Sequence, residues 1–177
     1  MRIIAGSRKG HTIYAPPGRV TRPTSDRVRE NTFNLIGPVD DASVLDVFAG
    51  SGALGLEAMS RGAASAVFVE SDRDAVRAIE RNVDKLRLTG VSVLQRDALQ
   101  VVAAEASAGR KYDLVLVDPP YDRYEEMQPT LARYLPLVLA EDGLLVFETD
   151  ARIEPELPLR LRTSRKYGSA RVTLFEH

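Results

Sequence analysis

The chain has 177 residues, of which 44% are hydrophobic and 28% charged, the size and composition of one globular domain. It contains no cysteine, which excludes disulfides and thiolate metal sites. Its two histidines, His11 and His177, lie at opposite ends of the sequence, so we expect neither a catalytic histidine nor a metal site. The N-terminus does not resemble a signal peptide, and no apolar run approaches the roughly 20 residues of a membrane span. We therefore expect a cytoplasmic protein.

The net charge of -1 conceals an uneven distribution of charge. Residues 1–36 carry seven basic and two acidic residues, a local charge of +5, which leaves -6 for the rest of the chain. A second basic cluster runs from Arg160 to Arg171 without an acid. Such clusters are typical of proteins that bind a polyanion, but they also occur on ordinary solvated faces. Charge alone does not decide between the two interpretations.

The first 36 residues predict a basic extension of a main domain that covers residues 37–177. Residues 2–15 are expected to form a β-hairpin with its turn at residues 6–10. A helix follows and ends at Gly37-Pro38. One face of that helix combines Val28, Thr32, Leu35 and Ile36, at the spacing of a 3.6-residue period.

From residue 43 onward, short apolar strands alternate with helices. Strands are expected over residues 44–48, 66–70, 91–95, 112–118 and 143–148, and helices over 53–61, 73–86, 98–106 and 124–139. Residues 159–166 and 170–175 read as a terminal hairpin. The alternation predicts an α/β, Rossmann-like fold, with a mostly parallel sheet and helices on both faces. Its ligand site should lie at the carboxyl ends of the strands, where the strand order reverses.

A glycine-rich turn joins the first of these strands to its helix. Gly50, Gly52 and Gly55 stand at the G-x-G-x-x-G spacing. Glycine suits such a turn because it accepts positive φ and lets the backbone approach a ligand closely. Glu70 ends the second strand 20 residues after Gly50, where its carboxylate can accept hydrogen bonds from ribose hydroxyls. This acid favours a cofactor site over a tight turn without a ligand.

Two further carboxylates favour S-adenosylmethionine over a dinucleotide as the cofactor. Asp46 lies inside the first strand, where it could meet a cationic amino group; under a pyrophosphate this position would usually be apolar. Asp97 follows the third strand and reads equally well as an acceptor for the adenine amino group or as a helix N-cap. The other cofactor contacts that we expect in this region are Phe48, Ala49, Gly50, Ser51, Gly52, Glu70, Ser71 and Ala98.

The most specific motif is Asp118-Pro119-Pro120-Tyr121, which directly follows the apolar run 114–117. An exocyclic amine of a base is a poor nucleophile because its lone pair is delocalised into the ring. The Asp118 carboxylate and the Pro119 carbonyl could accept its two N–H bonds and so localise the lone pair on nitrogen. Tyr121 would stack on the base, which must be exposed or flipped out of its helix. The motif predicts methylation of an exocyclic amine, and adenine N6 and guanine N2 both qualify.

Taken together, the motifs resemble those of the bacterial methyltransferases that modify guanine N2 in 16S ribosomal RNA. The similarity covers nearly the whole chain and is carried by residues 1–7, 9–10, 22–30, 33–34, 46–58, 68–70, 97 and 118–121. It implies a class I methyltransferase fold with a seven-stranded sheet and an N-terminal hairpin extension. It also implies that residues 118–121 hold the target base, and that Thr24 and Arg27 close over the methionine end of S-adenosylmethionine.

The implied partner is 16S ribosomal RNA, either free or within an assembled small-subunit particle, and we expect a monomer. RNA contacts are expected from the basic residues Arg2, Arg8, Lys9, Arg19 and Arg22. One departure from the family is the stretch from Glu141 to Gly143 and the short tail after Glu148, which leave little room for a final full-length helix.

Four other functions are considered on sequence grounds, of which a small-molecule methyltransferase is disfavoured because it would normally need a lid over its substrate instead of basic arms. A DNA or RNA adenine-N6 methyltransferase could use the same tetrapeptide, although the DNA enzymes usually carry a separate target-recognition domain, for which 177 residues leave no space. A dinucleotide-dependent oxidoreductase is favoured only by the glycine spacing. A non-catalytic RNA-binding module would use the basic arms alone.

Overall fold

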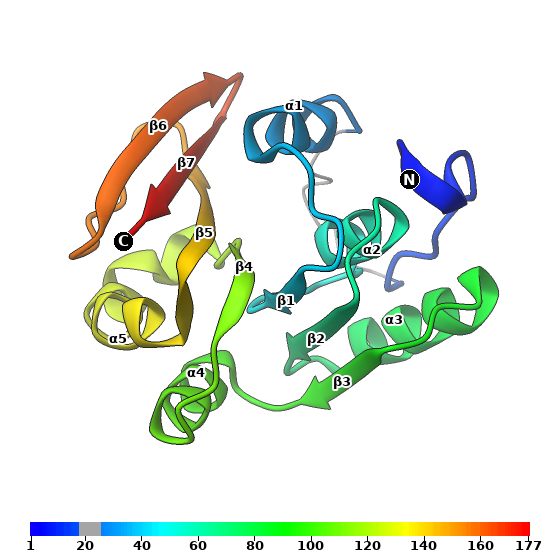
Figure 1. Ribbon diagram of the computed structural model, residues 1–177, viewed down its shortest axis with the longest axis horizontal. Helices are drawn as coiled ribbons and strands as arrows, with labels where there is room; N and C mark the ends of the chain where they lie inside the picture. The colour runs from blue at the N-terminus through cyan, green and yellow to red at the C-terminus, as the bar shows by residue number, and fades with distance from the viewer. Residues whose placement is uncertain (18–25) are drawn as a thin grey trace.

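A seven-stranded sheet forms the centre of the computed structural model, which describes residues 1–17 and 26–177 (Figure 1). Its strand order is β3-β2-β1-β4-β5-β7-β6. The strands are β1 (Ser43–Asp46), β2 (Ser65–Glu70), β3 (Val91–Gln95), β4 (Tyr112–Val117), β5 (Leu139–Asp150), β6 (Arg160–Tyr167) and β7 (Ala170–Glu176). Neighbouring strands from β3 to β5 are parallel, and β7 is antiparallel to both β5 and β6. The predicted α/β fold with a mostly parallel sheet is confirmed.

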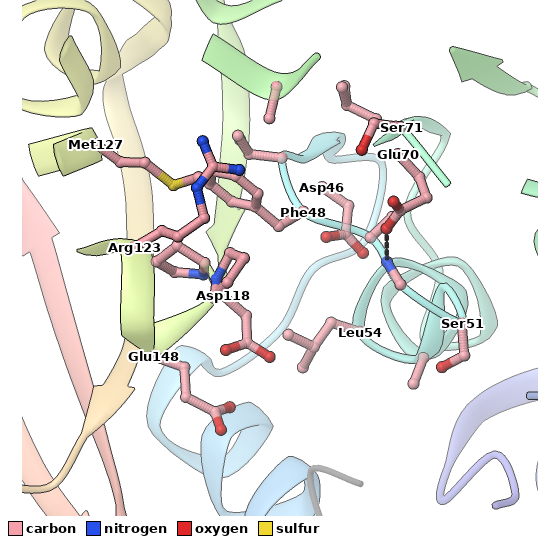
Figure 2. A pocket seen from close by; sticks show the side chains of 18 of the residues that line it. Asp46, Phe48, Ser51, Leu54, Glu70, Ser71, Asp118, Arg123, Met127 and Glu148 are labelled. Atoms are coloured by element: carbon pink, nitrogen blue, oxygen red, sulfur yellow. Dashed lines mark hydrogen bonds between the residues drawn. The ribbon is translucent and has the colours of Figure 1, made fainter. Parts of the chain in front are cut away.

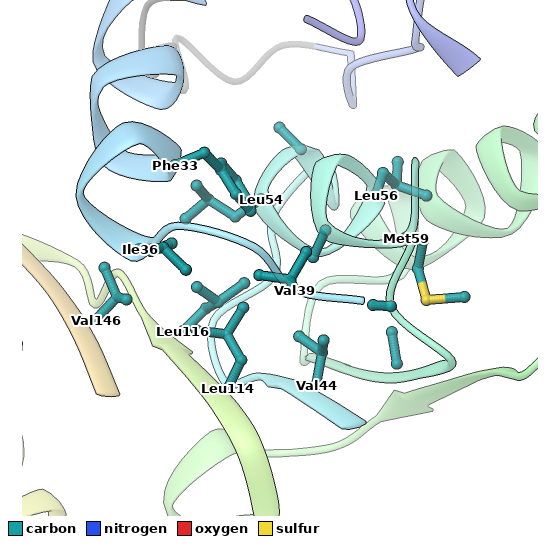
Figure 3. Close-up of a cluster of buried hydrophobic side chains, with 14 of the residues drawn as sticks. Phe33, Ile36, Val39, Val44, Leu54, Leu56, Met59, Leu114, Leu116 and Val146 are labelled. Carbon is teal, nitrogen blue, oxygen red and sulfur yellow. The ribbon is translucent and has the colours of Figure 1, made fainter. Parts of the chain in front are cut away.

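Helices cover both faces of this sheet, because alternate residues of each inner strand point to opposite sides. Leu114 and Leu116 of β4 belong to the core beneath α1, α2 and α3, part of which is drawn in Figure 3. Val115 and Val117 belong to the core beneath α4 and α5. The helices are α1 (Asp26–Ile36), α2 (Ala53–Ser60), α3 (Arg73–Leu86), α4 (Ala98–Ser107) and α5 (Tyr124–Val138), with short 3-10 turns at η1 (Gly6–Arg8) and η2 (Tyr121–Arg123). None of the helices within residues 1–17 and 26–177 has the length and apolarity needed to cross a membrane.

Local signals in the sequence fix the ends of α3. The Asp72 carboxylate accepts a hydrogen bond from the Ala75 backbone at 2.9 Å and so caps the first turn. Arg87 ends the helix in the left-handed conformation, with φ of 51°. The observed bounds equal the predicted range 73–86, and Ile79 and Leu86 are buried in the core.

The strand order reverses between β1 and β4. The chain runs outward from β1 to β2 and β3, then returns to add β4 on the other side of β1. The helices that follow β1 and β4 therefore diverge to opposite faces and leave a crevice at the carboxyl ends of these two strands. Asp46 ends β1 and Asp118 directly follows β4, so the fold brings the two halves of the predicted site to this crevice.

The N-terminal hairpin was only partly predicted. Arg2 and Thr12 form a single antiparallel bridge, and residues 6–8 form the 3-10 turn η1 instead of a simple hairpin turn. Glu57 of α2 accepts hydrogen bonds from the backbone N–H groups of Ile4 (2.8 Å) and Ala5 (3.0 Å), which would otherwise be available for strand pairing. The arm thus combines a short hairpin, with a bond from Ile3 N–H to the His11 carbonyl at 2.9 Å, with hydrogen bonds to α2.

Helix α1 buries a different face from the predicted one. Phe33 joins Thr32 and Ile36 in the interior, whereas Val28 and Leu35 are only partly buried. The fully buried face also includes Arg29, whose guanidinium pairs with Asp26 at 3.0 Å and with Glu57 at 3.5 Å. Apolar periodicity missed this face because a paired arginine occupies part of it.

Two features at the C-terminal end of the sheet differ from expectation. β5 begins at Leu139, earlier than predicted, with an irregular register opposite Tyr112–Leu114. Residues 151–159 then connect β5 to β6 as a loop, which accounts for the lack of room for a helix. In the second basic cluster, Arg171 is 7% exposed and pairs with Glu154, so this residue is not available on a polyanion-binding face.

Candidate active site

A cleft of about 640 Å³ opens at the carboxyl ends of the central strands (Figure 2). It joins the glycine-rich turn after β1, the end of β2, the start of α4 and the loop after β4. Its lining residues are Met1, Asp46–Ser51, Ala53, Leu54, Val69, Glu70, Ser71, Asp97, Ala98, Asp118–Arg123, Met127 and Glu148. Most of the residues predicted to bind the cofactor or the base therefore share one cavity.

The three positions of the turn require glycine for different structural reasons. Gly50 has φ of 55°, and among the described residues nothing lies within 4 Å of the place where a Cβ would stand, so a ligand can approach its backbone. A Cβ on Gly52 would instead meet core side chains at 3.2 to 3.4 Å, and Gly52 does not line the cleft. A Cβ on Gly55 would lie 2.4 Å from the ring of Phe68. Only the first of these glycines faces the cavity, and the other two allow α2 to pack closely on β2.

Asp46 is the most deeply buried carboxylate of the cleft, with 2% of its surface exposed. Its Oδ2 accepts a hydrogen bond from the Gly55 backbone at 3.0 Å, which aligns the start of α2 with the end of β1. Burial raises the pKa of Asp46 to about 7; the Gly55 hydrogen bond lowers it in part, and the nearby Glu70 carboxylate raises it further. A cationic ligand group would offset this burial by stabilising the ionised carboxylate.

Glu70 links the glycine turn to the end of β2. Its Oε2 accepts from the Gly50 backbone at 2.9 Å, the contact dashed in Figure 2, and its Oε1 accepts from the Asp72 backbone at 2.8 Å. Because an ionised carboxylate offers about four acceptor positions, these two bonds leave it able to accept from a ligand hydroxyl. Ser71, which follows it, is exposed at the rim of the cleft.

Asp97 acts as the N-cap of α4 and also lines the cleft. Its Oδ1 accepts a hydrogen bond from the Gln100 backbone at 3.0 Å, so the capping interpretation is confirmed. The side chain is exposed, and Ala98 beside it is buried. The proposed contact between Asp97 and an adenine amine is compatible with the cap, since one carboxylate can accept both bonds.

The Asp118-Pro119-Pro120-Tyr121 loop carries the catalytic candidates at the end of β4. Asp118 is half-buried, Pro119 is buried and Pro120 is exposed, so the first two residues lie deeper in the cleft than the third. The Tyr121 hydroxyl donates a hydrogen bond to Oε1 of Glu148 at 3.3 Å and so joins the loop after β4 to β5. This contact restrains the ring of Tyr121 at the wall of the cleft.

Comparisons with known proteins agree with this geometry. Residues 1–176 match the family described as Conserved hypothetical protein 95. The chain belongs to this family. YlbH from Bacillus subtilis (strain 168), provisionally named an rRNA methyltransferase, is 38% identical over 183 residues, covering 99% of this chain and 98% of that protein. Ribosomal RNA small subunit methyltransferase D from Escherichia coli (strain K12) is 43% identical over 124 residues, covering 70% of this chain and 61% of that protein.

A solved structure extends the comparison to the whole fold of the chain. The structure of yhhF from Escherichia coli, provisionally named a methyltransferase, has a TM-score of 0.84 and 34% sequence identity. It covers 100% of this chain and 97% of that chain. The N-terminal arm and the terminal strands are therefore part of the shared architecture.

The residues predicted to bind RNA in this Conserved hypothetical protein 95 chain occupy unequal environments. Arg2 and Lys9 are exposed on the N-terminal arm. Arg8 is half-buried, and its Nε donates to the Leu86 carbonyl at 2.6 Å, which fastens the arm to the end of α3. Arg27, which was predicted to close over the methionine end of the cofactor, is exposed on α1 and does not line the cleft. The predicted RNA contacts Arg19 and Arg22 and the predicted cofactor contact Thr24 lie outside the described residues.

Several residues that line the cleft were not predicted from the sequence, among them Glu148 and Met1. Glu148 follows the buried run Leu144–Phe147, which is the same pattern of an acid after a buried strand that located Asp118. Met1 reaches the cleft because the arm folds back over α2, and its Sδ lies 3.8 Å from Oγ of Ser51. The sequence pattern of an acid after an apolar strand could have predicted Glu148. No sequence pattern predicts Met1, because its position depends on how the arm packs against α2.

Proposed function

We propose that this chain transfers a methyl group from S-adenosylmethionine to the N2 amine of a guanine in 16S ribosomal RNA. One observation carries the proposal. The acids predicted to bind the cofactor, Asp46, Glu70 and Asp97, line the same cleft as the loop Asp118–Tyr121. Among the described residues, the lining includes six acidic side chains and a single arginine, Arg123. The division into a basic extension over residues 1–36 and a methyltransferase domain over 37–177 is part of the same proposal.

The chemistry of the cleft fits S-adenosylmethionine. Besides its carboxylate, this cofactor has an ammonium, a sulfonium, two ribose hydroxyls and an adenine amine, and each of these four kinds of group is cationic or donates hydrogen bonds. Asp46 would pair with the ammonium, Glu70 would accept from the ribose hydroxyls and Asp97 from the adenine amine. Gly50 leaves room for the ligand to approach the backbone. The pyrophosphate of a dinucleotide would instead meet these acids with like charge.

The residues of the loop would activate the amine by position and electrostatics. The Asp118 carboxylate and the Pro119 carbonyl accept the two amine hydrogens, which turns the nitrogen lone pair toward the cofactor. The bound cofactor supplies an electrophilic methyl group on a sulfonium. The carbon–nitrogen bond forms as the carbon–sulfur bond breaks, the electron pair goes to sulfur, and the surplus amine proton is lost to water. Tyr121 holds the base by stacking, worth roughly 1–3 kcal/mol per base.

The substrate half of the proposal rests on relatives and on charge. YlbH and methyltransferase D carry names that refer to ribosomal RNA, and the latter name specifies the small subunit. Exposed Arg2 and Lys9 on the arm, with Arg19 and Arg22 beside them in sequence, would bind RNA phosphates. We place this activity in the cytoplasm, with a monomer acting on RNA either free or in an assembled subunit.

Methyl transfer from labelled S-adenosylmethionine to 16S ribosomal RNA from an unmodified strain tests the proposal. Mass spectrometry of the nucleosides should find N2-methylguanosine. Asp118→Ala should reduce turnover by at least about 100-fold, because the amine loses its main acceptor, while the Kd of S-adenosylhomocysteine changes less than about threefold.

Three results would contradict the proposal. Calorimetric binding of NAD(P) without binding of S-adenosylhomocysteine would favour an oxidoreductase. N6-methyladenosine as the product would favour the adenine enzyme. RNA binding without turnover, unaltered by Asp118→Ala, would favour a non-catalytic module.

A further inference from the structure

We propose that Glu148 reads the Watson–Crick edge of the target base and selects guanine by accepting its N1–H. This inference rests on the proposed function and names a residue that decides its substrate. The tetrapeptide alone is compatible with adenine N6 and guanine N2, so a second group must discriminate between the two bases.

The register of the sheet places Glu148 beside the catalytic loop. Val117 of β4 and Phe147 of β5 are partners in the parallel ladder, so Asp118 and Glu148 occupy equivalent places at the next step of adjacent strands. Leu116 and Val146, two residues earlier, both point into the core beneath α1. By the alternation of strands, Asp118 and Glu148 share that face. Figure 2 shows the two carboxylates pointing the same way, toward the side of the sheet where α1 lies.

Glu148 is held in this position by its surroundings. It is 6% exposed, its backbone pairs with Val172 of β7, and its Oε1 accepts the hydroxyl of Tyr121 at 3.3 Å. A carboxylate offers about four acceptor positions, so the bond from Tyr121 is compatible with acceptance from a base. The residue that would stack on the base and the residue that would read its edge are therefore coupled.

The hydrogen-bonding patterns of the two bases differ at the atom next to the reactive amine. Guanine carries a donor, N1–H, beside its N2 amine, whereas adenine carries an acceptor, the N1 lone pair, beside its N6 amine. Adjacent strands lie about 4.8 Å apart, so carboxylates from neighbouring strand ends can reach neighbouring atoms of one base. With Asp118 on the amine and Glu148 on N1, guanine gains a charge-assisted hydrogen bond, and adenine meets a repulsion between the carboxylate and its lone pair.

A base analogue isolates this interaction. In 2,6-diaminopurine the 2-amine is retained, but N1 is an acceptor, as in adenine. The wild-type enzyme should methylate RNA with guanine at the target position far better than the same RNA with 2,6-diaminopurine. Glu148→Gln keeps an oxygen for the Tyr121 hydroxyl and provides an amide N–H that can donate to N1. It should lower kcat/KM for guanine on the order of 10- to 100-fold and narrow or reverse the preference over the analogue.

Glu141→Gln is the matched control, because Glu141 is an exposed acid near the other end of the same strand. It should leave the base preference unchanged, and both variants should keep the wild-type Kd for S-adenosylhomocysteine. An equal loss on both bases in Glu148→Gln would overturn the proposal by making the role structural, and an unchanged preference would overturn it directly. If the wild type methylates no guanine N2 at all, the proposed function fails first; if it does so and Glu148→Gln keeps its preference, only the role of Glu148 fails.

Discussion

If Asp46 pairs with the cofactor as proposed, its burial should make cofactor binding depend on pH. Its pKa of about 7 follows mainly from burial, so the carboxylate is largely protonated in mildly acidic solution. A cationic amine favours the ionised form, and binding below this pKa must therefore displace a proton. We expect the affinity for S-adenosylhomocysteine to fall below about pH 7, approaching tenfold per pH unit. Calorimetry between pH 5.5 and 8 measures this affinity. Asp46→Asn should bind S-adenosylhomocysteine more weakly and with little pH dependence. A wild-type affinity that does not change with pH would contradict the proposed role of Asp46.

Asp46→Asn should remain folded, so its weaker cofactor binding can be distinguished from a loss of stability. The folded protein retains the Asp46 proton between about pH 4 and 7, whereas the unfolded chain has lost it. The contribution of Asp46 to the free energy of unfolding therefore falls as the pH rises through this window. Asp46→Asn, whose amide oxygen can still accept from Gly55, should increase stability by roughly 1–4 kcal/mol at pH 8 and by less at pH 5. Denaturant unfolding at both pH values measures the difference, and a loss of stability at pH 8 would show that the charge itself supports the fold.

Individual site residues could be predicted from the sequence where an acid or a glycine ends or directly follows a strand. Asp46, Glu70 and Asp118 could be placed because parallel strands end at one edge of the sheet. Arg29 and Glu57 could not, because each is a charged residue in a helix whose partner lies far away in sequence. Their pairing is compatible with full burial only once α1 and α2 are packed together, and periodicity does not encode that contact.

Among the elements, the N-terminal arm depends on close contact with α2. Gly6 has φ of 82°, and a Cβ there would lie 1.8 Å from the Ser60 carbonyl oxygen. Gly10 has a similar φ of 83°, but among the described residues nothing lies within 4 Å of its Cβ position. Gly6→Ala should therefore destabilise the protein by roughly 1–3 kcal/mol more than Gly10→Ala, since only the first displaces the arm.

Denaturant unfolding of the two variants, with limited proteolysis of the arm, tests this difference. Faster cleavage within residues 1–17 is expected for Gly6→Ala alone. Equal destabilisation would mean that the shared backbone strain, and not the contact with Ser60, dominates.

The elements of the main domain were predicted closely, whereas the arm was not. The bounds of α3 and β3 follow from local capping and apolar runs, which depend on nearby residues. The arm keeps hairpin bonds of its own, such as Ile3 N–H to the His11 carbonyl at 2.9 Å, but other backbone groups bond to Glu57 and Ser60 of α2, more than 50 positions away. Hairpin signals describe local pairing only, so they predict the pairing within the arm but not its contacts with a distant helix.

For the molecule as a whole, the arm and the cleft should act together on RNA. Lys9 is exposed on the arm, and its charge can be changed without the packing contact that Arg8 makes with α3. Lys9→Glu should weaken RNA binding and reduce the slope of log K against log salt by about one, because a phosphate contact is lost. Filter binding or fluorescence anisotropy at several salt concentrations measures the slope. Arg133→Glu, on exposed α5 across the sheet, is the control and should leave it unchanged; equal effects would indicate a nonspecific change in net charge.

The order of the strands has a consequence for how the chain is made. β7 lies between β5 and β6 in the sheet although it follows both in sequence, so β5 has an unpaired edge until residues 170–176 have been synthesised. That edge carries the run Leu144–Phe147, which is apolar and capable of pairing with another chain. We therefore expect a chain truncated after β6 to expose the edge of its longest strand and to aggregate more readily than the full chain.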